Sequence, residues 1–330
     1  MKTTTNAYKK TKHKKIKEFF DFIIERQNMW HKRFVQHKTY PFSKDQVLAV
    51  NKFTNIYRQL DRTSLWVHDN IVNHYTKSNK TITDKKNAIL SIVMFRWFNN
   101  IKIHEEIGIL RYDNFDLVKY EKELLKLKET MPLSNSAAYL TPCLSGRTQL
   151  TALMELLTTV YNDIDSFIEV FTNATEGSEI MSKLRSLFGI GSFMAYEMYC
   201  DIVETGMTEC TLNSVISKGP GSNKGMYLIF DNHNYVDNFN YLFDNQHMYT
   251  KRLKFNNYLE PVEDKLSLRV IEHSLCEFMK YKRLQAIPSG KKTSNTKYKS
   301  VSDMPNATID STGMALSYKK PLPEFISDRS

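Results

Sequence analysis

The sequence of 330 residues has little cysteine and no long hydrophobic run. Its four cysteines are Cys143, Cys200, Cys210 and Cys276, and no two of them form a C-x-x-C pair. This spacing argues against a zinc ribbon, a cysteine-ligated iron–sulfur cluster and a disulfide scaffold. The longest nearly apolar run, 88–95, is too short to span a bilayer, and the N-terminus lacks the apolar stretch of a secretory signal. We therefore expect a soluble, intracellular protein with no membrane partner.

Acidic residues are also in short supply. The chain has 36 Asp and Glu against 46 Lys and Arg, which gives a formal net charge of +10. This excess favours a polyanionic partner, with nucleic acid first and an anionic membrane surface second. A lysine-rich surface that only reflects an AT-rich genome is the plain alternative. Six lysines between Lys9 and Lys17 predict a flexible basic arm over 1–17, or simply a solvated terminus.

Helical periodicity dominates the rest of the chain and strand signals are few, so the sequence predicts a mainly α protein. One helical domain is expected over 18–285, in two lobes that break near 131–147, a polar segment that contains Pro142. The tail, 286–330, is rich in Ser, Lys and Asn and is expected to be mostly disordered. Helices are predicted over 19–35, 47–60, 66–75, 85–99, 115–129, 148–161, 164–171 and 265–284, and Asp45 is expected to cap the second of them.

Only 11 glycines are present, and five of them fall in two short segments. These are Gly189 and Gly191 in one segment, and Gly219, Gly221 and Gly225 in the other. A Gly-x-Gly turn between two helices can adopt positive φ and present backbone N–H groups to an anion. Both segments are therefore predicted to be loops that bind a nucleic-acid phosphate.

The first of these turns is expected to join two helices within 179–204. Leu187 and Phe188 are expected on the apolar face of the helix before it, and Phe193 in the interior of the helix after it. Ser192 is a candidate cap for the second helix. Lys183 and Arg185 add local positive charge. An ordinary αα turn without a ligand is the plain alternative.

Three further segments place polar groups in unusual surroundings. Residues 51–62 are expected to put Arg58, Asp61 and Arg62 on one helix face. Residues 95–99 put Arg96 inside an aromatic cluster, where a charge needs a partner. Residues 272–281 put Glu272, His273 and Lys280 on a helix that is otherwise apolar.

Together with LFGIGSFMAYE and GPGSNKG, these segments resemble the α-glutamyl/putrescinyl-thymine pyrophosphorylases of phages and viruses. That family is related to the helical domain named for the 5-hydroxymethyldeoxyuridine DNA kinase, and the resemblance covers about 47–281. It implies a helix-hairpin-helix, DNA glycosylase-like helical fold whose hairpin amides hold a DNA phosphate. No cofactor is implied apart from a structural cation at the hairpin. The implied partners are double-stranded DNA with modified pyrimidines and a small amine or amino acid, in a protein encoded by a phage or virus.

The implied reaction is displacement of diphosphate from a flipped 5-diphosphomethyl-uracil base by the amine, which needs cations for the leaving group and a carboxylate for the proton. Arg58, Asp61, Arg96, Asp201 and Glu209 are the catalytic candidates. The DNA-binding candidates are Lys183, Gly189, Gly191, Ser192, Gly219, Gly221, Lys224 and Gly225. Tyr57, Trp97 and Tyr196 are candidates for base stacking, and Arg62, Asn99, Glu272 and Lys280 complete the set.

Each candidate has a simpler interpretation. Arg58 with Asp61 or Arg62 can be an ordinary ion-paired helix face, and Asp201 a solvated one. Lys224 can sit in a surface turn. His273 and Cys276 are two lone potential metal ligands, so a core histidine is favoured and no metal is expected.

Three other functions stay open. A DNA glycosylase needs, by the same resemblance, an aspartate in the segment after the hairpin. Asp201 comes too early for it, and Glu209 is the substitute that this sequence offers. A kinase is disfavoured because the chain has no G-x-x-x-x-G-K-[ST] motif. A non-catalytic DNA-binding protein of the same fold is the third.

Overall fold

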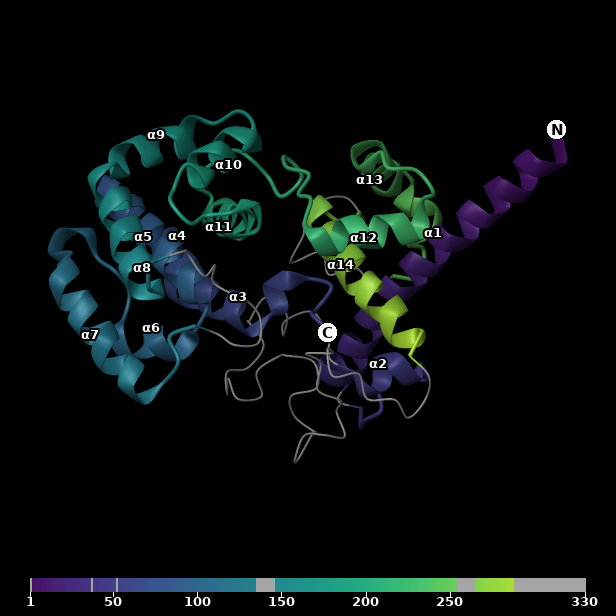
Figure 1. Cartoon of the computed structure of the whole chain (residues 1–330), viewed down its shortest axis with the longest axis horizontal. Coiled ribbons are helices and arrows are strands. Elements are labelled where there is room, and N and C mark those ends of the chain that lie inside the picture. The colour runs from purple at the N-terminus through teal and green to yellow at the C-terminus, as the bar shows by residue number, and fades with distance from the viewer. Residues whose placement is uncertain (1, 37, 52, 135–145, 254–264, 288–330) are drawn as a thin grey trace. The chain divides into compact units, whose positions relative to one another are not determined.

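The computed structural model describes residues 2–36, 38–51, 53–134, 146–253 and 265–287 (Figure 1). Every regular element within these residues is helical, which confirms the mainly α prediction. The helix-hairpin-helix, glycosylase-like superfamily itself stays a prediction. No helix of the described residues combines the length and the apolarity that a membrane crossing needs.

The chain divides into two units, unit 1 (1–62 and 218–330) and unit 2 (63–217). Unit 1 holds α1 (Lys2–Trp30), η1 (His31–Val35), α2 (Gln46–Val50), η2 (Arg58–Leu60), α12 (Pro220–Ile229), α13 (Tyr235–Asn245), η5 (Gln246–Met248) and α14 (Leu268–Gln285). Unit 2 holds α3 (Arg62–Val67, whose first residue closes unit 1), η3 (His68–Val72), α4 (Asn73–Thr76), α5 (Ile82–Phe98), α6 (Ile101–Ile107), η4 (Tyr112–Asn114), α7 (Leu117–Thr130), α8 (Gln149–Asn162), α9 (Ile164–Asn173), α10 (Gly177–Arg185) and α11 (Ser192–Thr205).

This division differs from the lobes that we predicted. The polar segment 131–147 lies within unit 2, and its residues 135–145 are outside the described part of the chain. A polar, proline-containing stretch marks a connection between elements, but it does not tell a loop inside a unit from a linker between units. The tail that we expected to be disordered also lies outside the described residues from 288 onward.

The N-terminal segment is helical where we predicted a flexible arm. Residues 2–17 form the first turns of α1. The Lys15 ammonium pairs with Asp231 at 2.8 Å, and Lys17 pairs with Asp21 one turn further along α1 at 2.5 Å. These ion pairs give the end of the basic run acidic partners within unit 1.

Aromatic side chains of α1 and α14 form the core of unit 1. Phe19 and Phe22 pack edge-on or tilted against Phe278 of α14, with ring centroids 5.5 and 5.7 Å apart. Phe20 stacks on Tyr249 at 5.2 Å. Each of these buried rings contributes about 1.5–3 kcal/mol through removal from water, so α1 is held to α14 and to Tyr249 by aromatic packing.

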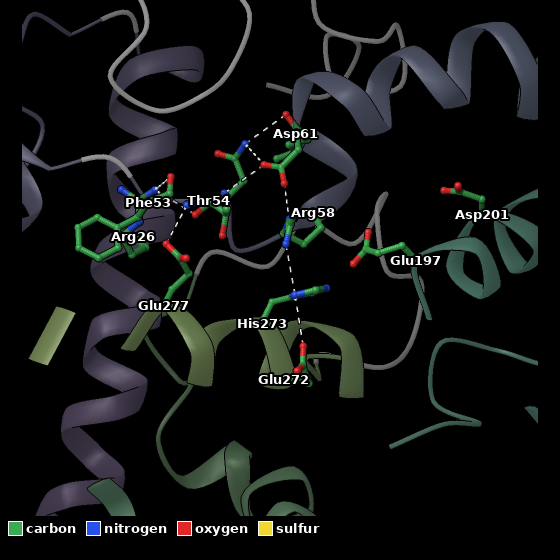
Figure 2. Close-up of polar contacts among 12 residues, drawn as sticks. Arg26, Phe53, Thr54, Arg58, Asp61, Glu197, Asp201, Glu272, His273 and Glu277 are labelled. Carbon is green, nitrogen blue, oxygen red and sulfur yellow. Dashed lines mark hydrogen bonds and ion pairs between the residues drawn. The ribbon is translucent and has the colours of Figure 1, made fainter. Parts of the chain in front are cut away.

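The helix predicted over 47–60 was wrong after its first turn. Asp45 does cap α2, since its carboxylate accepts from Leu48 N at 3.0 Å, but α2 ends at Val50. The backbone beyond is bonded by distant side chains (Figure 2): the guanidinium of Arg26 donates to Phe53 O and Thr54 O, at 3.1 and 3.2 Å, and Thr54 N donates to Glu277 at 3.0 Å. These groups satisfy backbone atoms that a helix would pair internally, so the segment stays irregular.

Arg26 itself is buried, at 4% exposure. Burial lowers its pKa to about 10, although Glu277 and Asp61 raise it in part. Its guanidinium also lies 5.4 Å from the centroid of the Phe53 ring. A charge this deep is retained because it bonds two backbone carbonyls that have no helical partner.

Unit 2 is built around α5 and α11. All eleven residues from Ala88 to Phe98 are buried, so the second half of α5 is enclosed on every side. α11 packs against it and is itself buried from Met194 to Ile202. A helix that is buried all round is the central helix of its unit.

An aromatic cluster at the end of α5 contains an uncharged histidine. Trp66 stacks on Phe95 with centroids 4.9 Å apart, and the His104 ring lies 4.8 Å from Phe95. Burial lowers the pKa of His104 to about 3, and its Nε2 has no hydrogen-bond partner among the described residues. The folded protein therefore excludes the protonated form of this side chain.

Acid is expected to destabilise unit 2 through His104. Below pH 6.5, its ordinary pKa, the unfolded chain takes up a proton that the folded chain does not accept until about pH 3. Stability should fall by about 1.4 kcal/mol per pH unit over this window, or about 2 kcal/mol at pH 5. Urea unfolding of the wild type and of His104→Phe, followed by tryptophan fluorescence at pH 7.5 and pH 5, checks this. From pH 7.5 to pH 5, the free energy of unfolding should fall less for His104→Phe than for the wild type. Replacement of the exposed His233 by Phe should leave the loss between these two pH values as it is in the wild type.

Candidate active site

Four polar side chains meet in unit 1, and we call them the unit 1 cluster: Arg58, Asp61, Glu272 and His273. Figure 2 shows Arg58 between Asp61 and His273. The Nε of Arg58 donates to Asp61, and its Nη1 lies 3.2 Å from Nδ1 of His273. The same Nδ1 lies 3.3 Å from a carboxylate oxygen of Glu272. The cluster thus brings together residues 215 positions apart in the chain.

Local structure fixes both halves of this cluster. Arg58 opens the short turn η2, and Asp61 ends it with its backbone N–H bonded to Arg58 O. The Asn55 side chain donates to Leu60 O and to the Asp61 carboxylate, at 3.2 and 2.9 Å, which fixes the turn. On α14, Glu272 accepts from Gly219 N at 3.4 Å, at the start of α12.

The histidine can hold a proton in two ways. A guanidinium only donates, so Nδ1 of His273 accepts from Arg58 when its imidazole is neutral with the proton on Nε2. A carboxylate only accepts, so the Glu272 contact becomes a hydrogen bond once Nδ1 is protonated. Arg58 and Asp61 are partly exposed, with 17% and 14% of their side-chain surface accessible. Glu272 and His273 are buried, at 6% and 5% exposure, so proton uptake at Nδ1 requires the contact with Arg58 to open.

A second group, the unit 2 cluster, consists of Arg96, Glu197 and Asp201. The Arg96 guanidinium binds Asp201 with two hydrogen bonds of 2.5 Å, and Glu197 lies 3.7 Å from its Nη1. All three side chains are 1% exposed. We predicted that Arg96 needs a charged partner, and Asp201 is that partner. Burial this complete favours a structural tie between α5 and α11, and the catalytic roles predicted for Arg96 and Asp201 stay untested.

The predicted hairpin is present between α10 and α11. Gly189 has φ of +77°, a left-handed conformation that favours glycine. Gly191 is the N-cap of α11 with φ of −82° and without a side-chain cap, so Ser192 is the first helical residue and not the cap that we predicted. The first N–H groups of α11 follow directly at an exposed turn.

Two of the three apolar residues predicted to pack beside this turn, Phe188 and Phe193, are exposed, so the prediction was wrong for them, whereas Leu187 is buried as expected. Phe188 and Phe193 flank the glycines at 42% and 47% exposure. The tight turn leaves Leu187 and Ile190 to fill the core, since both are buried, and directs the two rings outward. The Arg147 guanidinium covers the Phe188 ring at 4.3 Å. Lys183 is committed elsewhere, because its ammonium pairs with Asp163 at 2.6 Å.

The second glycine segment is not a loop. Pro220 starts α12, with Gly219 as its N-cap, so Gly221, Lys224 and Gly225 are helical. A Cβ on Gly225 would lie 2.1 Å from Leu275 O, and one on Gly221 would lie 2.3 Å from the sulfur of Cys276. These two glycines let α12 approach α14 closely, which corrects their predicted role in a phosphate loop. Lys224 is exposed on α12.

The three predicted stacking residues are buried. Tyr57 and Tyr196 are 1% exposed, and Trp97 is fully covered with its indole N–H bonded to Gln149 O at 3.2 Å. Stacking on a base would need these rings to become accessible, so this role stays a prediction. Glu209, by contrast, is exposed in the segment after α11.

The remaining candidates lie apart from one another along the chain. Asn99 is buried at the C-cap of α5 in a left-handed conformation, with φ of 48°. Lys280 is buried beside Glu277, at 3.3 Å, and above the Phe53 ring; burial lowers its pKa. Arg62 is half-buried at the start of α3. Within the described residues, Lys280 thus takes part in the packing of α14 in unit 1.

We also looked for potential metal ligands that lie together among the described residues. No group of three or more His, Cys, Asp or Glu side chains there is arranged to hold an ion. Burial raises the pKa of Cys276 to about 12, so its thiol stays protonated. His273 is buried with its Nδ1 3.2 Å from Nη1 of Arg58, so it lies in the core as predicted, and the expectation of no metal stays a prediction.

Sequence reasoning missed Glu197 and the role of Asn55. Glu197 lies four residues before Asp201 on one helix, and this i, i+4 spacing was the available signal. Nothing in the sequence placed Asn55 against Asp61, because that contact depends on the irregular backbone of 53–57.

Comparison with known proteins identifies the family. A family model described as the helical domain of 5-hmdU DNA kinase matches residues 13–291. The chain belongs to this family. It is also similar to a 5-hmdU DNA kinase of Bacillus phage SP10, with 24% identity over 292 residues. The match covers 82% of this chain and 45% of that protein, so the chain spans less than half the length of this relative.

No solved structure matches the chain. The family is related to the thymine pyrophosphorylases that the sequence motifs resemble, so the predicted relationship is confirmed. No solved structure can therefore be compared with the geometry of the unit 1 cluster.

Proposed function

We propose that this chain is the helical part of an enzyme of thymine hypermodification, acting on DNA that carries a 5-hydroxymethyluracil derivative. The kinase of Bacillus phage SP10 is named for that nucleoside, and the family carries the same name. The net charge of +10 suits a DNA partner. A base must leave the helix stack to be modified, and the exposed hairpin with its two phenylalanines offers a surface for the surrounding strand.

The reaction that we propose is displacement at the 5-methylene carbon of a diphosphorylated base. The amine nitrogen forms a bond to that carbon, the carbon–oxygen bond to diphosphate breaks, and diphosphate leaves with the electron pair. The nitrogen then gives up a proton. The observation that carries this proposal is the position of His273 Nδ1, between Nη1 of Arg58 and a carboxylate oxygen of Glu272.

In this mechanism the two sides of the histidine have separate tasks. Glu272 stabilises the imidazolium that forms when His273 takes the proton. Arg58 is a partner for the negative charge that develops on the leaving diphosphate. Asp61 orients Arg58 through its bond to Nε. All four groups come from unit 1.

Nucleoside mass spectrometry tests the proposal. The chain is incubated with DNA that contains 5-diphosphomethyl-uracil and a mixture of small amines, and the DNA is then digested. An aminated nucleoside together with released diphosphate is expected. Glu272→Gln keeps an acceptor for Gly219 N but loses the charge, and turnover should fall by about 10²–10⁴-fold. Glu209→Gln, at an exposed position of unit 2, should leave turnover unchanged.

Base excision is the second candidate, and the exposure of Glu209 after the hairpin helix favours it. In that case the same assay yields a free base and abasic DNA, and Glu209→Gln is the variant that loses activity. A kinase reaction, suggested by the relative's name, would give a phosphorylated nucleoside from ATP, although the sequence has no G-x-x-x-x-G-K-[ST]. DNA binding without any product would indicate a non-catalytic protein.

A further inference from the structure

A cleft in unit 2 has no role in the chemistry above. Its volume is about 450 Å³, and it is lined by Asp69, Asn70, Asn73, His74, Lys77, Ser78 and Ile109. A smaller cavity adjoins it and shares Asn70, His74 and Ile109 with it. Six of the seven lining residues of the cleft are polar, and its size lies within the range of small-molecule sites.

A π-helical turn forms one wall of the cleft. In η3 the backbone N–H of Asn73 bonds to His68 O, five residues earlier. This wide turn continues directly into α4 and places Asp69, Asn70 and Asn73 at the same cleft. Turns of this kind are rare and often occur at functional sites.

The amide groups on this wall present acceptors. Nδ2 of Asn70 donates to Trp66 O at 2.8 Å, and Nδ2 of Asn73 lies 3.3 Å from Nδ1 of His68. Each amide therefore uses its NH₂ group within the helix and retains its carbonyl oxygen. The Asp69 carboxylate, which also lies 3.8 Å from Nδ1 of His68, adds a third acceptor group to the wall. A primary ammonium has three donors and no acceptor, so it complements this set.

Positive charge lies one turn further along the chain. Lys77 is exposed and pairs with no described residue, and His74 lines both cavities. Ser78 is occupied, since its hydroxyl donates to Tyr75 O at 2.7 Å. An ammonium carried together with a carboxylate matches the acceptors of the η3 wall and Lys77, which line the same cleft.

We propose that this cleft binds a small zwitterionic amine of the α-amino acid class, with its ammonium on Asp69, Asn70 and Asn73 and its carboxylate on Lys77. The inference rests on the proposed function, because such a molecule is the amine that the transfer reaction consumes.

Three matched probes test the binding on the full chain by calorimetry. L-serine carries both charges, ethanolamine lacks its carboxylate, and 3-hydroxypropanoate lacks its ammonium. L-serine should bind most tightly. Asp69→Asn should weaken L-serine and ethanolamine about tenfold or more, the loss expected when a charged hydrogen bond becomes neutral. Lys77→Met should weaken L-serine and leave ethanolamine unchanged. Asp113→Asn, an exposed aspartate of η4, should change nothing.

Several results would overturn this assignment. They are binding of 3-hydroxypropanoate as tight as that of L-serine, equal L-serine affinity in Asp69→Asn and the wild type, and no binding of any probe at millimolar concentration. If Asp69→Asn does not fold, shifts of the Asn70 and Asn73 side-chain amide signals on titration of the wild type with L-serine decide the matter. These measurements need no DNA. A chain that aminates DNA but binds no probe here takes its amine elsewhere, and the proposed function then stands without this site.

Discussion

Replacement of Arg96 by methionine is expected to destabilise unit 2 by about 3–5 kcal/mol, because it leaves buried carboxylates without their cation. Asp201 would lose both of its 2.5 Å bonds, and Glu197 the guanidinium that lies 3.7 Å away. Neither carboxylate has more than 1% of its side-chain surface in contact with water. Urea unfolding followed by tryptophan fluorescence, to which Trp66 and Trp97 contribute from unit 2 and Trp30 from unit 1, measures the loss.

Arg147→Met is the matched control for this experiment. Arg147 also binds a carboxylate at 2.5 Å, that of Glu155, but the two side chains are 40% and 45% exposed. An exposed ion pair contributes about 0–1 kcal/mol, so this variant should remain close to the wild type. Arg96→Met with Asp201→Leu should recover part of the lost stability, because apolar residues replace a buried pair at little cost. If Arg96→Met is as stable as Arg147→Met, the tie between α5 and α11 has another origin.

Helices with strong periodicity could be predicted from the sequence. α5, α7, α8, α9 and α14 lie within a few residues of the expected ranges, because their apolar spacing and their caps are local signals. No helix was predicted over the Asn- and Asp-rich residues of α13, because they conceal its buried face. Local pattern thus determined most of the elements, although not their division into two units.

Segment 51–61 could not be predicted because its partners are distant in sequence. Arg26 and Glu277 hold its backbone from two other helices, 27 and 223 residues away. Its residues have a pattern compatible with a helix, and only the tertiary contacts decide against one. The unit 1 cluster depends on the same segment, so the sequence indicated Arg58 with Asp61 and not their contact with His273.

The role of the glycine segments could not be predicted from the sequence alone either. A glycine is needed both where φ is positive and where two backbones come close, and the sequence does not distinguish these cases. Gly189 belongs to the first kind. Gly221 and Gly225 belong to the second, as the structure of α12 and α14 shows.

Replacement of Gly225 by alanine is therefore expected to lower the stability of unit 1 by about 2 kcal/mol. Alanine favours a helix over glycine by about 1 kcal/mol, and that gain alone would stabilise α12. The new Cβ would lie 2.1 Å from the backbone oxygen of Leu275, however, so the two helices must separate, at an overpacking cost of about 3 kcal/mol. Urea unfolding followed by circular dichroism measures the net effect. Gly191→Ala has no steric cost, with φ of −82° and no atom within 4 Å of its Cβ, and should lose only about 0.5–1 kcal/mol because alanine is a poorer N-cap than glycine.

A test at Gly221, one helical turn before Gly225, distinguishes a role of these glycines in close packing from a role in phosphate binding. Gly221→Ala meets the sulfur of Cys276 at 2.3 Å, a side-chain atom that can be removed. Adding Cys276→Ala should restore most of the stability that Gly221→Ala loses, because the nearest remaining atom is then the Cβ at 3.2 Å. The same addition should not rescue Gly225→Ala, whose obstacle is backbone. Since Glu272 and Gly219 N face each other across this helix pair, the rescued protein should also regain turnover. Restored stability with turnover still absent would instead return the glycines to a direct role in substrate binding.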